Sequence, residues 1–550
     1  MTKKEIPIGY IEAKDLGADL KSKSYQEQFD RYRNSLDNLI ITNYIDFQVY
    51  KDGVNVAEYS IASIQGSKII SKPDQFETFN SFLVDFSNRI GQTIKSASKL
   101  AEMMAHKSKL LALTIESALT SDEENQDNST LKEQWSAFKD ILIHDISEKE
   151  FADIYAQTIA YGMFAARLHD ISLESFSRKE AAELIPKSNP FLRKLFQYIA
   201  GFDLDSRIVW IVDALADIFR AADVASILKN FGKTTQQNDP IIHFYETFLA
   251  EYDPKLRKAR GVWYTPEPVV NFIIKAVDEL LKREFGINDG LSDTSKTKIK
   301  VKIANKVTAD QRSKIRYSNE DVEVHKVQIL DPATGTGTFL AEIIKFIYNN
   351  KFQGQEGIWT SYVEEHLIPR LNGFEILMAS YSMAHLKLDL LLSETGFKPK
   401  KEQRFKVYLT NSLEEYHPDT GTLFANWLSS EANEANAIKR DVPVMAIIGN
   451  PPYNILSKNL SDEQRKLVEK YKFINGERVK EKGALQLEKN LNDDYVKFIS
   501  LGENFVKKNT QGVLAFINNN NFLDALTLRG MRWNLLDTFD QIYILDLHGN

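Results

Sequence analysis

The stretch DPATGTGTFL, residues Asp331–Leu340, decides the fold of the C-terminal half of this chain of 550 residues. It follows the apolar run Val327–Leu330 and leads into a segment with helical apolar spacing. Glycine tolerates sharp turns and lets a ligand approach the backbone, so Gly335 and Gly337 indicate a strand–turn–helix unit. Such a turn can bind a nucleotide-like cofactor at the mouth of a parallel sheet. Alone it is moderately specific, because it is not GxGxxG and no Walker lysine follows.

Short apolar strands alternate with helical segments from residue 251 onward. The expected strands are Val327–Leu330, Leu371–Glu375, Phe405–Leu409, Val444–Gly449, Val513–Ile517 and Gln541–Leu547. This alternation predicts an α/β domain over residues 251–550 with a largely parallel sheet. The charged, glycine-punctuated region Ser457–Leu491 is expected to be a mobile loop. The lysine-rich stretch Lys296–Arg316 is expected to be a surface excursion.

A second motif, NPPY (Asn450–Tyr453), follows the apolar run Val444–Gly449. Its two prolines fix φ and remove two backbone donors, so the carbonyls of Asn450 and Pro451 can act as pure acceptors. Together with the Asn450 side-chain oxygen, they suit the two hydrogens of an exocyclic amine. Tyr453 supplies a flat ring for stacking on a base, and the whole arrangement suits an extruded adenine. The alternative interpretation is a turn with a buried tyrosine.

These motifs resemble those of the gamma-class N6-adenine DNA methyltransferases, and more closely those of the single-chain restriction–modification enzymes of types IIG and ISP. DPATGTGTFL is similar to the family's S-adenosylmethionine motif, and NPPY to its catalytic motif. GVWYTPEPVVNFI (Gly261–Ile273) is similar to the element that closes over the methionine end of the cofactor. The order of the three motifs matches as well. The resemblance implies a Rossmann-like methyltransferase sheet and methyl transfer to the N6 amine of a flipped adenine in double-stranded DNA.

The resemblance also implies the residues of the site. The catalytic residues are expected to be Asn450, Pro451, Pro452 and Tyr453. The residues expected to bind S-adenosylmethionine are Tyr264, Thr265, Pro266, Asp331, Pro332, Ala333, Thr334, Gly335, Gly337, Thr338, Phe339, Glu375, Asn411, Ser412 and Asn450.

Some of these positions have more detailed expected roles. Glu375 is expected to hold the ribose hydroxyls, as in dinucleotide sites, although it can also be a helix-capping glutamate. Asn411 stands where the family often has Asp, near the cofactor adenine. Asp494 and Tyr495 are expected to line the floor between cofactor and target. The step needs no metal.

The N-terminal segment GYIEAKD (Gly9–Asp15) resembles half of a PD-(D/E)xK nuclease site. In that family the carboxylate, here Glu12, helps to hold Mg²⁺, and the lysine, here Lys14, orients water. Gln28 and Tyr32 form QxxxY, as in the RecB-like branch. Glu5 is the one acid before Glu12, so the resemblance implies a partial nuclease domain over residues 1–68 that lacks its first half. A chance match is the alternative.

Residues 69–250 form a different kind of sequence. Glycine and proline are sparse, and apolar residues recur at helical spacing, which predicts a connector of about seven helices. The acidic stretch Thr120–Thr130 is expected to be a solvated loop, and Ile41–Tyr50, before the connector, a half-buried strand. The chain ends on an apolar strand signal where the family continues into a target-recognition domain. We therefore expect a fragment without that domain.

Composition narrows the function further. With no cysteine, the chain cannot form disulfides, thiolate zinc sites or iron–sulfur clusters. No apolar run approaches the roughly 18 residues of a spanning helix, and no signal core is present, so a cytoplasmic protein without a membrane partner is expected. The net charge of −7 means that DNA must be held by local patches. No obligate protein partner is evident, and Mg²⁺ is expected for the nuclease part alone.

Other functions stay open from the sequence. The chain can be an inactive remnant that binds cofactor or DNA without catalysis, or an RNA or protein methyltransferase, because NPPY-like motifs also serve those substrates. Phe231–Thr234 resembles the end of a Walker motif but lacks its earlier glycine, so an NTPase is not expected. The basic run Lys255–Arg260 is a candidate phosphate contact or a solvated helix face.

Overall fold

The computed structural model of the chain divides into two compact units. It describes residues 2–3, 6–7, 9–36, 38–51, 53–66, 68–88, 94, 96–125, 129–170, 175–222, 224, 227, 240–253, 265–305, 316–401, 403–414, 423–453, 457, 459–479 and 484–547. The first unit comprises Met1–Lys132, Ser147–Ile185 and Leu192–Arg257, and the second comprises Glu133–Ile146, Pro186–Phe191 and Lys258–Asn550.

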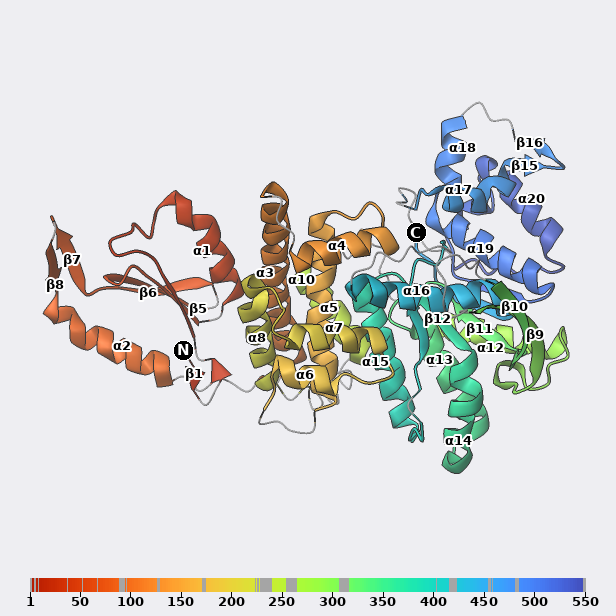
Figure 1. The fold of residues 1–550 in the computed structure, drawn as a ribbon, viewed down its shortest axis with the longest axis horizontal. Helices are drawn as coiled ribbons and strands as arrows, with labels where there is room; N and C mark the ends of the chain where they lie inside the picture. Colours follow the sequence, from red (N-terminus) through yellow and green to blue (C-terminus); the bar gives the residue numbers. More distant parts are fainter. Residues whose placement is uncertain are drawn as a thin grey trace. The chain divides into compact units, whose positions relative to one another are not determined.

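A four-stranded sheet opens the first unit (Figure 1). Its strands, in spatial order, are β3 (Tyr10–Ala13), β4 (Asn38–Thr42), β5 (Asp46–Lys51) and β6 (Val54–Ser60). β3 and β4 are parallel, and the other neighbours are antiparallel. Helix α1 (Lys23–Ser35) packs Phe29 against buried residues of β4 and β5. The pairs β1 (Thr2–Lys3) with β2 (Ile6–Pro7) and β7 (Ala62–Gln65) with β8 (Lys68–Ser71), and helix α2 (Phe76–Asn88), complete this part.

The single strand expected over Ile41–Tyr50 is interrupted by a turn. The side-chain oxygen of Asn43 accepts hydrogen bonds from the backbone N–H groups of Ile45 and Asp46, at 3.0 and 2.7 Å. Tyr44 takes a positive φ of 70°. Such Asx turns compete with the strand ladder, so the apolar alternation is split between β4 and β5.

In the part of the chain between α2 and residue 253 that the structure describes, most residues are helical. The helices are α3 (Ala97–Glu124), α4 (Thr130–Ile141), α5 (Glu148–Leu168), α6 (Arg178–Leu184), α7 (Pro190–Ala200), α8 (Ser206–Arg220) and α10 (Pro240–Tyr252). α5 begins at a capping box made by Ser147 and Glu150, and it is buried along most of its length. Helix α3 continues into the acidic stretch that was expected to be a loop. Arg207 explains this, because it pairs with buried Asp122 at 2.9 Å.

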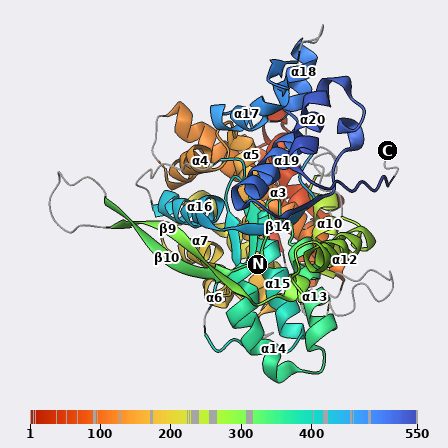
Figure 2. The same cartoon turned by 90° about the vertical axis from the view of Figure 1, so that its right-hand side faces the viewer.

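A five-stranded parallel sheet forms the centre of the second unit (Figures 1 and 2). Its strands, in spatial order, are β13 (Lys406–Leu409), β12 (Leu371–Glu375), β11 (Gln328–Asp331), β14 (Val444–Gly449) and β17 (Val513–Phe516). All neighbours are parallel. Every residue of β11, β12 and β14 is buried, so both faces of the sheet are covered. The expected α/β fold is confirmed.

Helices cover this sheet. Among them, α12 (Glu267–Arg283), α15 (Met378–Glu394), α16 (Leu423–Asp441) and α19 (Asp494–Asn509) contact its strands, and the unit also contains α13 (Thr338–Ile347), α14 (Glu356–Tyr362) and α20 (Arg529–Thr538). The sheet core joins Leu330, Phe374 and Ile447 to Phe505 of α19 and Ala435 of α16. In the part of the chain that the structure describes, no helix is both long enough and apolar enough to cross a bilayer.

Two expectations for the second unit are wrong. Gln541–Leu547 forms no strand, and its apolar side chains, such as Tyr543 and Leu545, are exposed. A strand needs a hydrogen-bonding neighbour, and none of the described strands pairs with this segment. Ser457–Leu491 contains α17 (Asp462–Glu469), β15 (Phe473–Ile474), β16 (Glu477–Arg478) and α18 (Ala484–Leu491). Here the buried side chains of Val468, Tyr471 and Leu491 pack in one core with α19 and α20. The many charged residues in this segment gave no sign of that core in the sequence.

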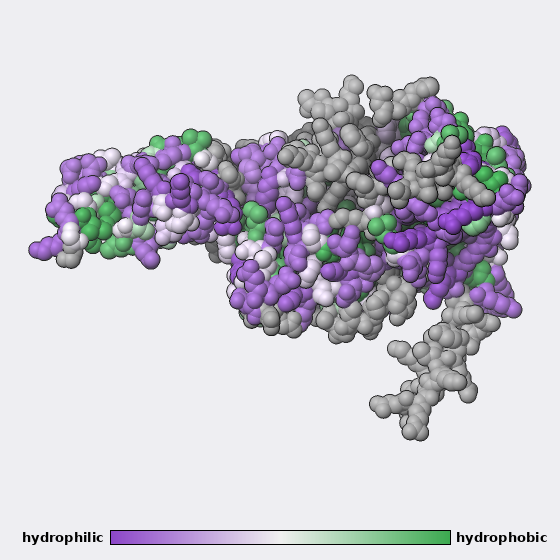
Figure 3. Space-filling view, turned by 90° about the horizontal axis from the view of Figure 1, so that it is seen from above, coloured by the Kyte–Doolittle hydropathy of each residue, from purple (hydrophilic) through white to green (hydrophobic). Residues whose placement is uncertain are grey.

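The lysine-rich excursion is an antiparallel ribbon. β9 (Lys296–Asn305) pairs with β10 (Arg316–His325) along ten residues, and Figure 2 shows the ribbon extending away from the sheet. The register sets Lys298 opposite Glu323 and Lys300 opposite Asp321, so lysines face acids across the ribbon. The face drawn in Figure 3 is mostly hydrophilic, with hydrophobic residues in small groups.

Candidate active site

The candidate site lies where the parallel strands end. β11 stands between β12 and β14, so the chain moves outward in one direction through β12 and β13, and in the other through β14 and β17. Parallel α/β sheets bind ligands at such a switch point, beyond the carboxyl ends of the strands. Asp331, Glu375, Asn411 and Asn450 lie at or just after the ends of β11, β12, β13 and β14 respectively.

The glycine turn after β11 is held tightly on one side and open on the other. Gly335 and Gly337 have positive φ values of 55° and 81°. A Cβ atom added to Gly337 would lie 3.2 Å from the Cα of Ala384 in α15, so glycine is needed for this packing. A Cβ atom added to Gly335 would meet nothing within 4 Å. The open side of the turn therefore has room for a ligand.

Asp331 is buried beneath this turn. Its Oδ1 accepts a hydrogen bond from the backbone N–H of Ala333 at 3.1 Å. Burial raises the pKa of Asp331 to about 8. A Cβ atom added to Gly449, the last residue of β14, would lie 2.8 Å from the same oxygen. The strand that leads to NPPY and the strand that leads to the glycine turn are thus in close contact at the site.

Glu375 joins two backbone segments. Its Oε2 accepts from the N–H of Gly335 at 2.7 Å, and its Oε1 accepts from the N–H groups of Ile376 and Leu377 at 3.0 and 2.8 Å. Burial raises its pKa to about 7, against these donors, which lower it. The bonds to Ile376 and Leu377, just before α15, agree with the capping alternative, whereas the bond to Gly335 holds the glycine turn.

The residues after β13 close the site on another side. Ser412 donates a hydrogen bond from Oγ to the carbonyl of Pro332 at 2.5 Å. Asn411 accepts from the N–H of Leu413 at 3.1 Å and donates from Nδ2 to Asn459 at 3.4 Å. The sequence-predicted positions Asn411 and Ser412 therefore lie between the glycine turn and the segment that follows NPPY.

NPPY forms a connected set of polar contacts. Asn450 donates from Nδ2 to Oγ1 of Thr265 at 3.1 Å. The Tyr453 hydroxyl lies 2.7 Å from Asn450 Oδ1 and 3.0 Å from the carbonyl oxygen of Ile517. Tyr453 is 39% exposed, and burial of its hydroxyl end raises its pKa to about 12. Its ring meets that of Tyr495 edge to face, with centroids 6.4 Å apart.

The floor beside NPPY contains a buried ion pair that the sequence did not reveal. Lys497 is fully buried and donates to Ser457 Oγ at 2.9 Å and to the carbonyl of Asn459 at 2.5 Å. Asp494 accepts from Ser457 Oγ and, at 2.9 Å, from Asn459 Nδ2. Asp494 and Lys497 thus fasten the segment after NPPY to α19. The Tyr495 hydroxyl is buried and has no hydrogen-bond partner among the described residues.

A further contact reaches the site from α4 and the turn after it. His144 Nε2 lies 3.1 Å from Glu414 Oε2, and Glu414 Oε1 accepts from Gln464 at 2.9 Å. The hydrogen bond to Glu414 raises the pKa of His144. The sequence could not predict this contact, because His144 precedes Glu414 by 270 positions.

The remaining expected positions are placed as follows. Thr265 and Pro266 precede α12, with Pro266 at its N-cap. Thr338 opens α13 and accepts from Lys387 at 3.3 Å, and Phe339 is buried. Tyr264, Phe231–Thr234 and Lys255–Arg260 lie outside the described residues.

The four N-terminal residues predicted for a nuclease site lie together. Lys14 Nζ lies 2.8 Å from Glu12 Oε1 and 2.8 Å from Gln28 Oε1. Gln28 in turn donates to the Tyr32 hydroxyl at 3.2 Å. Within the described ranges, no group of three or more histidine or acidic side chains is placed to hold a metal ion.

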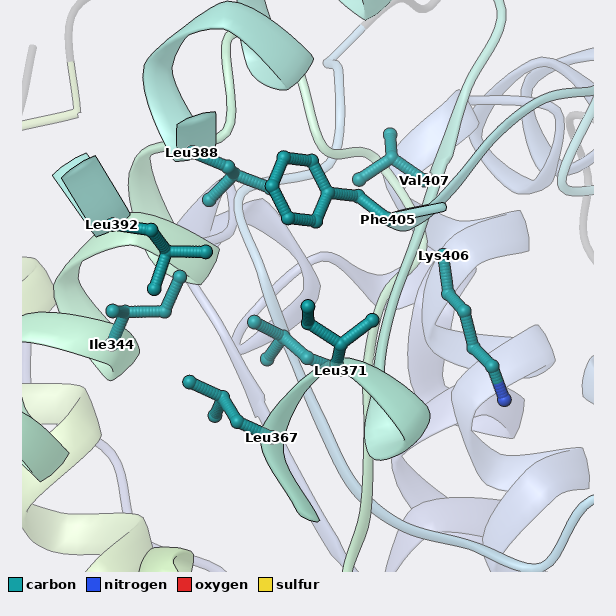
Figure 4. A pocket seen from close by; sticks show the side chains of 9 residues that line it. Ile344, Leu367, Leu371, Leu388, Leu392, Phe405, Lys406 and Val407 are labelled. Atoms are coloured by element: carbon teal, nitrogen blue, oxygen red, sulfur yellow. The ribbon is translucent and has the colours of Figure 1, made fainter. Parts of the chain in front are cut away.

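A small apolar pocket lies at the opposite ends of the strands (Figure 4). It is lined by Leu371, Phe405 and Val407 of the sheet region and by Ile344, Leu388 and Leu392 of α13 and α15. Its one cationic lining residue, Lys406, donates to the carbonyl of Pro369 at 2.7 Å. This pocket lacks the convergent polar groups of the strand-end site, so it is not the candidate for catalysis.

Comparisons with known proteins show which solved structures share this fold. Among curated proteins, no sequence matches the chain. A solved DrdV–DNA complex is similar in fold, with 21% identity, a TM-score of 0.50, and coverage of 97% of this chain and 45% of that one. A nuclease-deletion mutant of the Type ISP restriction-modification enzyme LlaGI, in complex with a DNA substrate mimic, has 18% identity, a TM-score of 0.53, and coverage of 84% and 33%.

A third solved structure extends this pattern. The ATP-dependent Type ISP restriction-modification enzyme LlaBIII bound to DNA has 19% identity, a TM-score of 0.56, and coverage of 84% of this chain and 28% of that one. The chain therefore spans less than half the length of each of these proteins. A family model matches residues 372–550, which include NPPY. That model describes the Eco57I restriction-modification methylase family, so this part of the chain is similar to that family.

Proposed function

We propose that the chain is a site-specific DNA methyltransferase that moves a methyl group from S-adenosylmethionine to the N6 amine of an adenine flipped out of double-stranded DNA. It would act as part of a restriction–modification protein. One observation carries the proposal. The glycine turn, Glu375, Asn411 and NPPY stand at the carboxyl ends of neighbouring parallel strands, and hydrogen bonds join Gly335 to Glu375 and Ser412 to Pro332 in the turn.

The cofactor side of the site fits S-adenosylmethionine. The open space above Gly335 admits a ligand to the backbone, and Glu375 offers carboxylate oxygens beside it for the ribose hydroxyls. Asn411 and Ser412 border the place for the adenine, and Thr265 and Pro266 the place for the methionine end. When bound, the cofactor supplies a methyl group on a sulfonium centre. The chain's own task is to hold it in line with the target.

The target side fits an exocyclic amine. Asn450 Oδ1 and the carbonyls of the two residues Asn450 and Pro451 are acceptors at the end of β14, and the amine brings two hydrogens. Two acceptors draw the nearly planar amine toward tetrahedral geometry and stabilise the charge that develops on it. The half-exposed ring of Tyr453 can stack on the base. Lys497 and Asp494 keep the following segment in place beneath this site.

DNA as the substrate is supported by the similar solved structures, whose descriptions name bound DNA or a DNA mimic. Because the chain has a net charge of −7, its DNA contacts must be local. An RNA or protein substrate would use the same acceptors, and an inactive remnant would bind the cofactor without transferring the methyl group.

The N-terminal contacts favour a second function. Glu12 of β3, Lys14 just after this strand, and Gln28 and Tyr32 of α1 form one hydrogen-bonded row, which supports a PD-(D/E)xK-like module. We propose such a module, with Mg²⁺ as the metal it would need. Among the residues that the structure describes, Glu12 is the carboxylate paired with Lys14. One carboxylate holds Mg²⁺ too weakly for cleavage, because this ion keeps most of its waters and needs several ligands.

Calorimetry with S-adenosylmethionine tests the main proposal. The wild-type chain should bind, and Gly335→Val should not, since valine fills the approach to the turn. Gly354→Val is the matched control. Gly354 also has a positive φ, 80°, and open space around an added Cβ, but it lies outside the site. No binding by the wild-type chain, or equal affinity in the Gly335→Val variant, would refute the cofactor site.

A further inference from the structure

Thr265 and Asn450 lie in contact although 185 positions separate them. Thr265 immediately precedes the N-cap of α12, and Asn450 follows β14. The Thr265 Oγ1 atom accepts a hydrogen bond from Asn450 Nδ2 at 3.1 Å. This hydrogen bond uses Nδ2 of Asn450, the amide nitrogen, which donates and cannot accept.

The two ends of an asparagine amide have opposite hydrogen-bonding roles. Its oxygen accepts, and its nitrogen carries two hydrogens and donates. A target amine is itself a donor, so it needs Asn450 Oδ1 in front of it. Rotation of the amide by about 180° would bring two donor groups face to face and remove the acceptor. Activity therefore depends on which way this amide points.

Tyr453 does not fix that direction. Its single hydroxyl hydrogen is shared between two acceptors, Asn450 Oδ1 at 2.7 Å and the Ile517 carbonyl at 3.0 Å. When the hydrogen serves Ile517, the Tyr453 oxygen can accept from a rotated Asn450 Nδ2. On the other side of the amide, the Thr265 hydroxyl accepts from Nδ2 in the observed orientation, whereas with a rotated amide it would have to donate to Oδ1. The productive amide therefore has both ends paired only while this hydroxyl is present.

We infer that Thr265 is a positioning residue for Asn450, which keeps Oδ1 directed at the target amine by accepting from Nδ2. This inference rests on the proposed function. Without the Thr265 oxygen, the productive orientation leaves an N–H group unpaired. The rotated orientation of the Asn450 amide leaves only its carbonyl oxygen unpaired on that side. Proteins tolerate an unpaired carbonyl oxygen more readily than an unpaired N–H group. The rotated, unproductive amide would then predominate.

Thr265→Val and Thr265→Ser separate this role from packing. Valine keeps the shape of threonine and removes the hydroxyl, whereas serine keeps the hydroxyl. In methyl transfer to duplex DNA, kcat should fall about tenfold in Thr265→Val, the loss of one hydrogen bond, and stay within about twofold in Thr265→Ser. The Kd for S-adenosylmethionine is measured by calorimetry in both variants, because Thr265 also borders the place for the methionine end, and kcat is compared at saturating cofactor.

Asn450→Asp provides the second arm. A carboxylate has two equivalent oxygens and presents an acceptor in either orientation. In single-turnover assays, adding Thr265→Val to Asn450→Asp should therefore change the rate by less than about twofold. A purely structural role of Thr265 would cost as much in both backgrounds.

The outcomes are distinct. Equal kcat values for wild type and Thr265→Val, a weaker Kd for the cofactor that accounts for the loss, or an undiminished effect in the Asn450→Asp background would each overturn the inference alone. A wild-type chain that transfers no methyl group would overturn the proposed function, and the inference with it.

Discussion

Gly449→Ala probes the contact between the two motif-bearing strands. The added Cβ would lie 2.8 Å from Asp331 Oδ1, 3.5 Å from Asp331 Cγ and 3.6 Å from a ring carbon of Phe516. The first distance is shorter than carbon and oxygen tolerate, so a group must move. Asp331 is 1% exposed and its Oδ1 is held by the N–H of Ala333, so it cannot swing into solvent.

The size of the effect follows from this overlap. An extra methyl group in a well-packed site costs about 1–3 kcal/mol. In a unit of this size, 1 kcal/mol lowers the unfolding temperature by about 2–4 °C, so a fall of several degrees is expected. The affinity for S-adenosylmethionine should weaken as well, because displacement of Asp331 moves the glycine turn.

Thermal unfolding and calorimetry measure both effects. Gly357→Ala, in α14, is the matched control, because its added Cβ meets nothing within 4 Å. Alanine in a helix should leave stability unchanged or raise it by up to about 1 kcal/mol. In an Asp331→Ala background, Gly449→Ala should lower stability little further, because the carboxylate that the added Cβ would meet is no longer there. Unchanged stability and cofactor affinity in Gly449→Ala would refute the close approach of the two motifs.

Three other predictions concern the same chain. Asn450→Ala should remove about 3–4 kcal/mol of transition-state stabilisation and so slow methyl transfer, while the Kd for S-adenosylmethionine stays nearly constant. Retained activity in this variant would show that Asn450 is not catalytic. The folded chain raises the pKa of Asp331 from 3.8 to about 8 and that of Glu375 from 4.5 to about 7. Between these values the folded chain binds more protons than the unfolded chain. The stability of the cofactor-free chain should therefore fall as pH rises toward 8. Thermal unfolding against pH should show a shallower fall in Glu375→Gln, and an unchanged slope would contradict the shift. Plasmid DNA with Mg²⁺ should remain uncut, and cleavage that disappears in Lys14→Ala would show a complete nuclease site.

Local sequence signals predicted the elements that the site needs. The apolar runs before DPATGTGTFL and NPPY are buried strands, and the glycines after the first run take positive φ. Such features depend on neighbouring residues and leave a trace in a short window. The run Gln541–Leu547 has the same apolar pattern but forms no strand. A strand must pair with a neighbouring strand, and a short stretch of sequence does not reveal whether that neighbour exists.

Long-range contacts could not be predicted in this way. Nothing near Thr265 indicates that Asn450 will lie beside its hydroxyl, and nothing near Lys497 indicates that it will hold the segment after NPPY. The helices within Ser457–Leu491 were hidden for a related reason. Their buried residues are few and spaced among charges, and they gain a core only against α19 and α20.

Methyl transfer to DNA tests the central claim most directly. A duplex with an adenine opposite an abasic site lowers the cost of extruding the base. After incubation with the wild-type chain and S-adenosylmethionine, the DNA is digested and its nucleosides are separated by mass spectrometry. The account predicts N6-methyladenine with the wild-type chain and none with Asn450→Ala. Absence of N6-methyladenine from the wild-type reaction, or an equal amount in the two reactions, would contradict it.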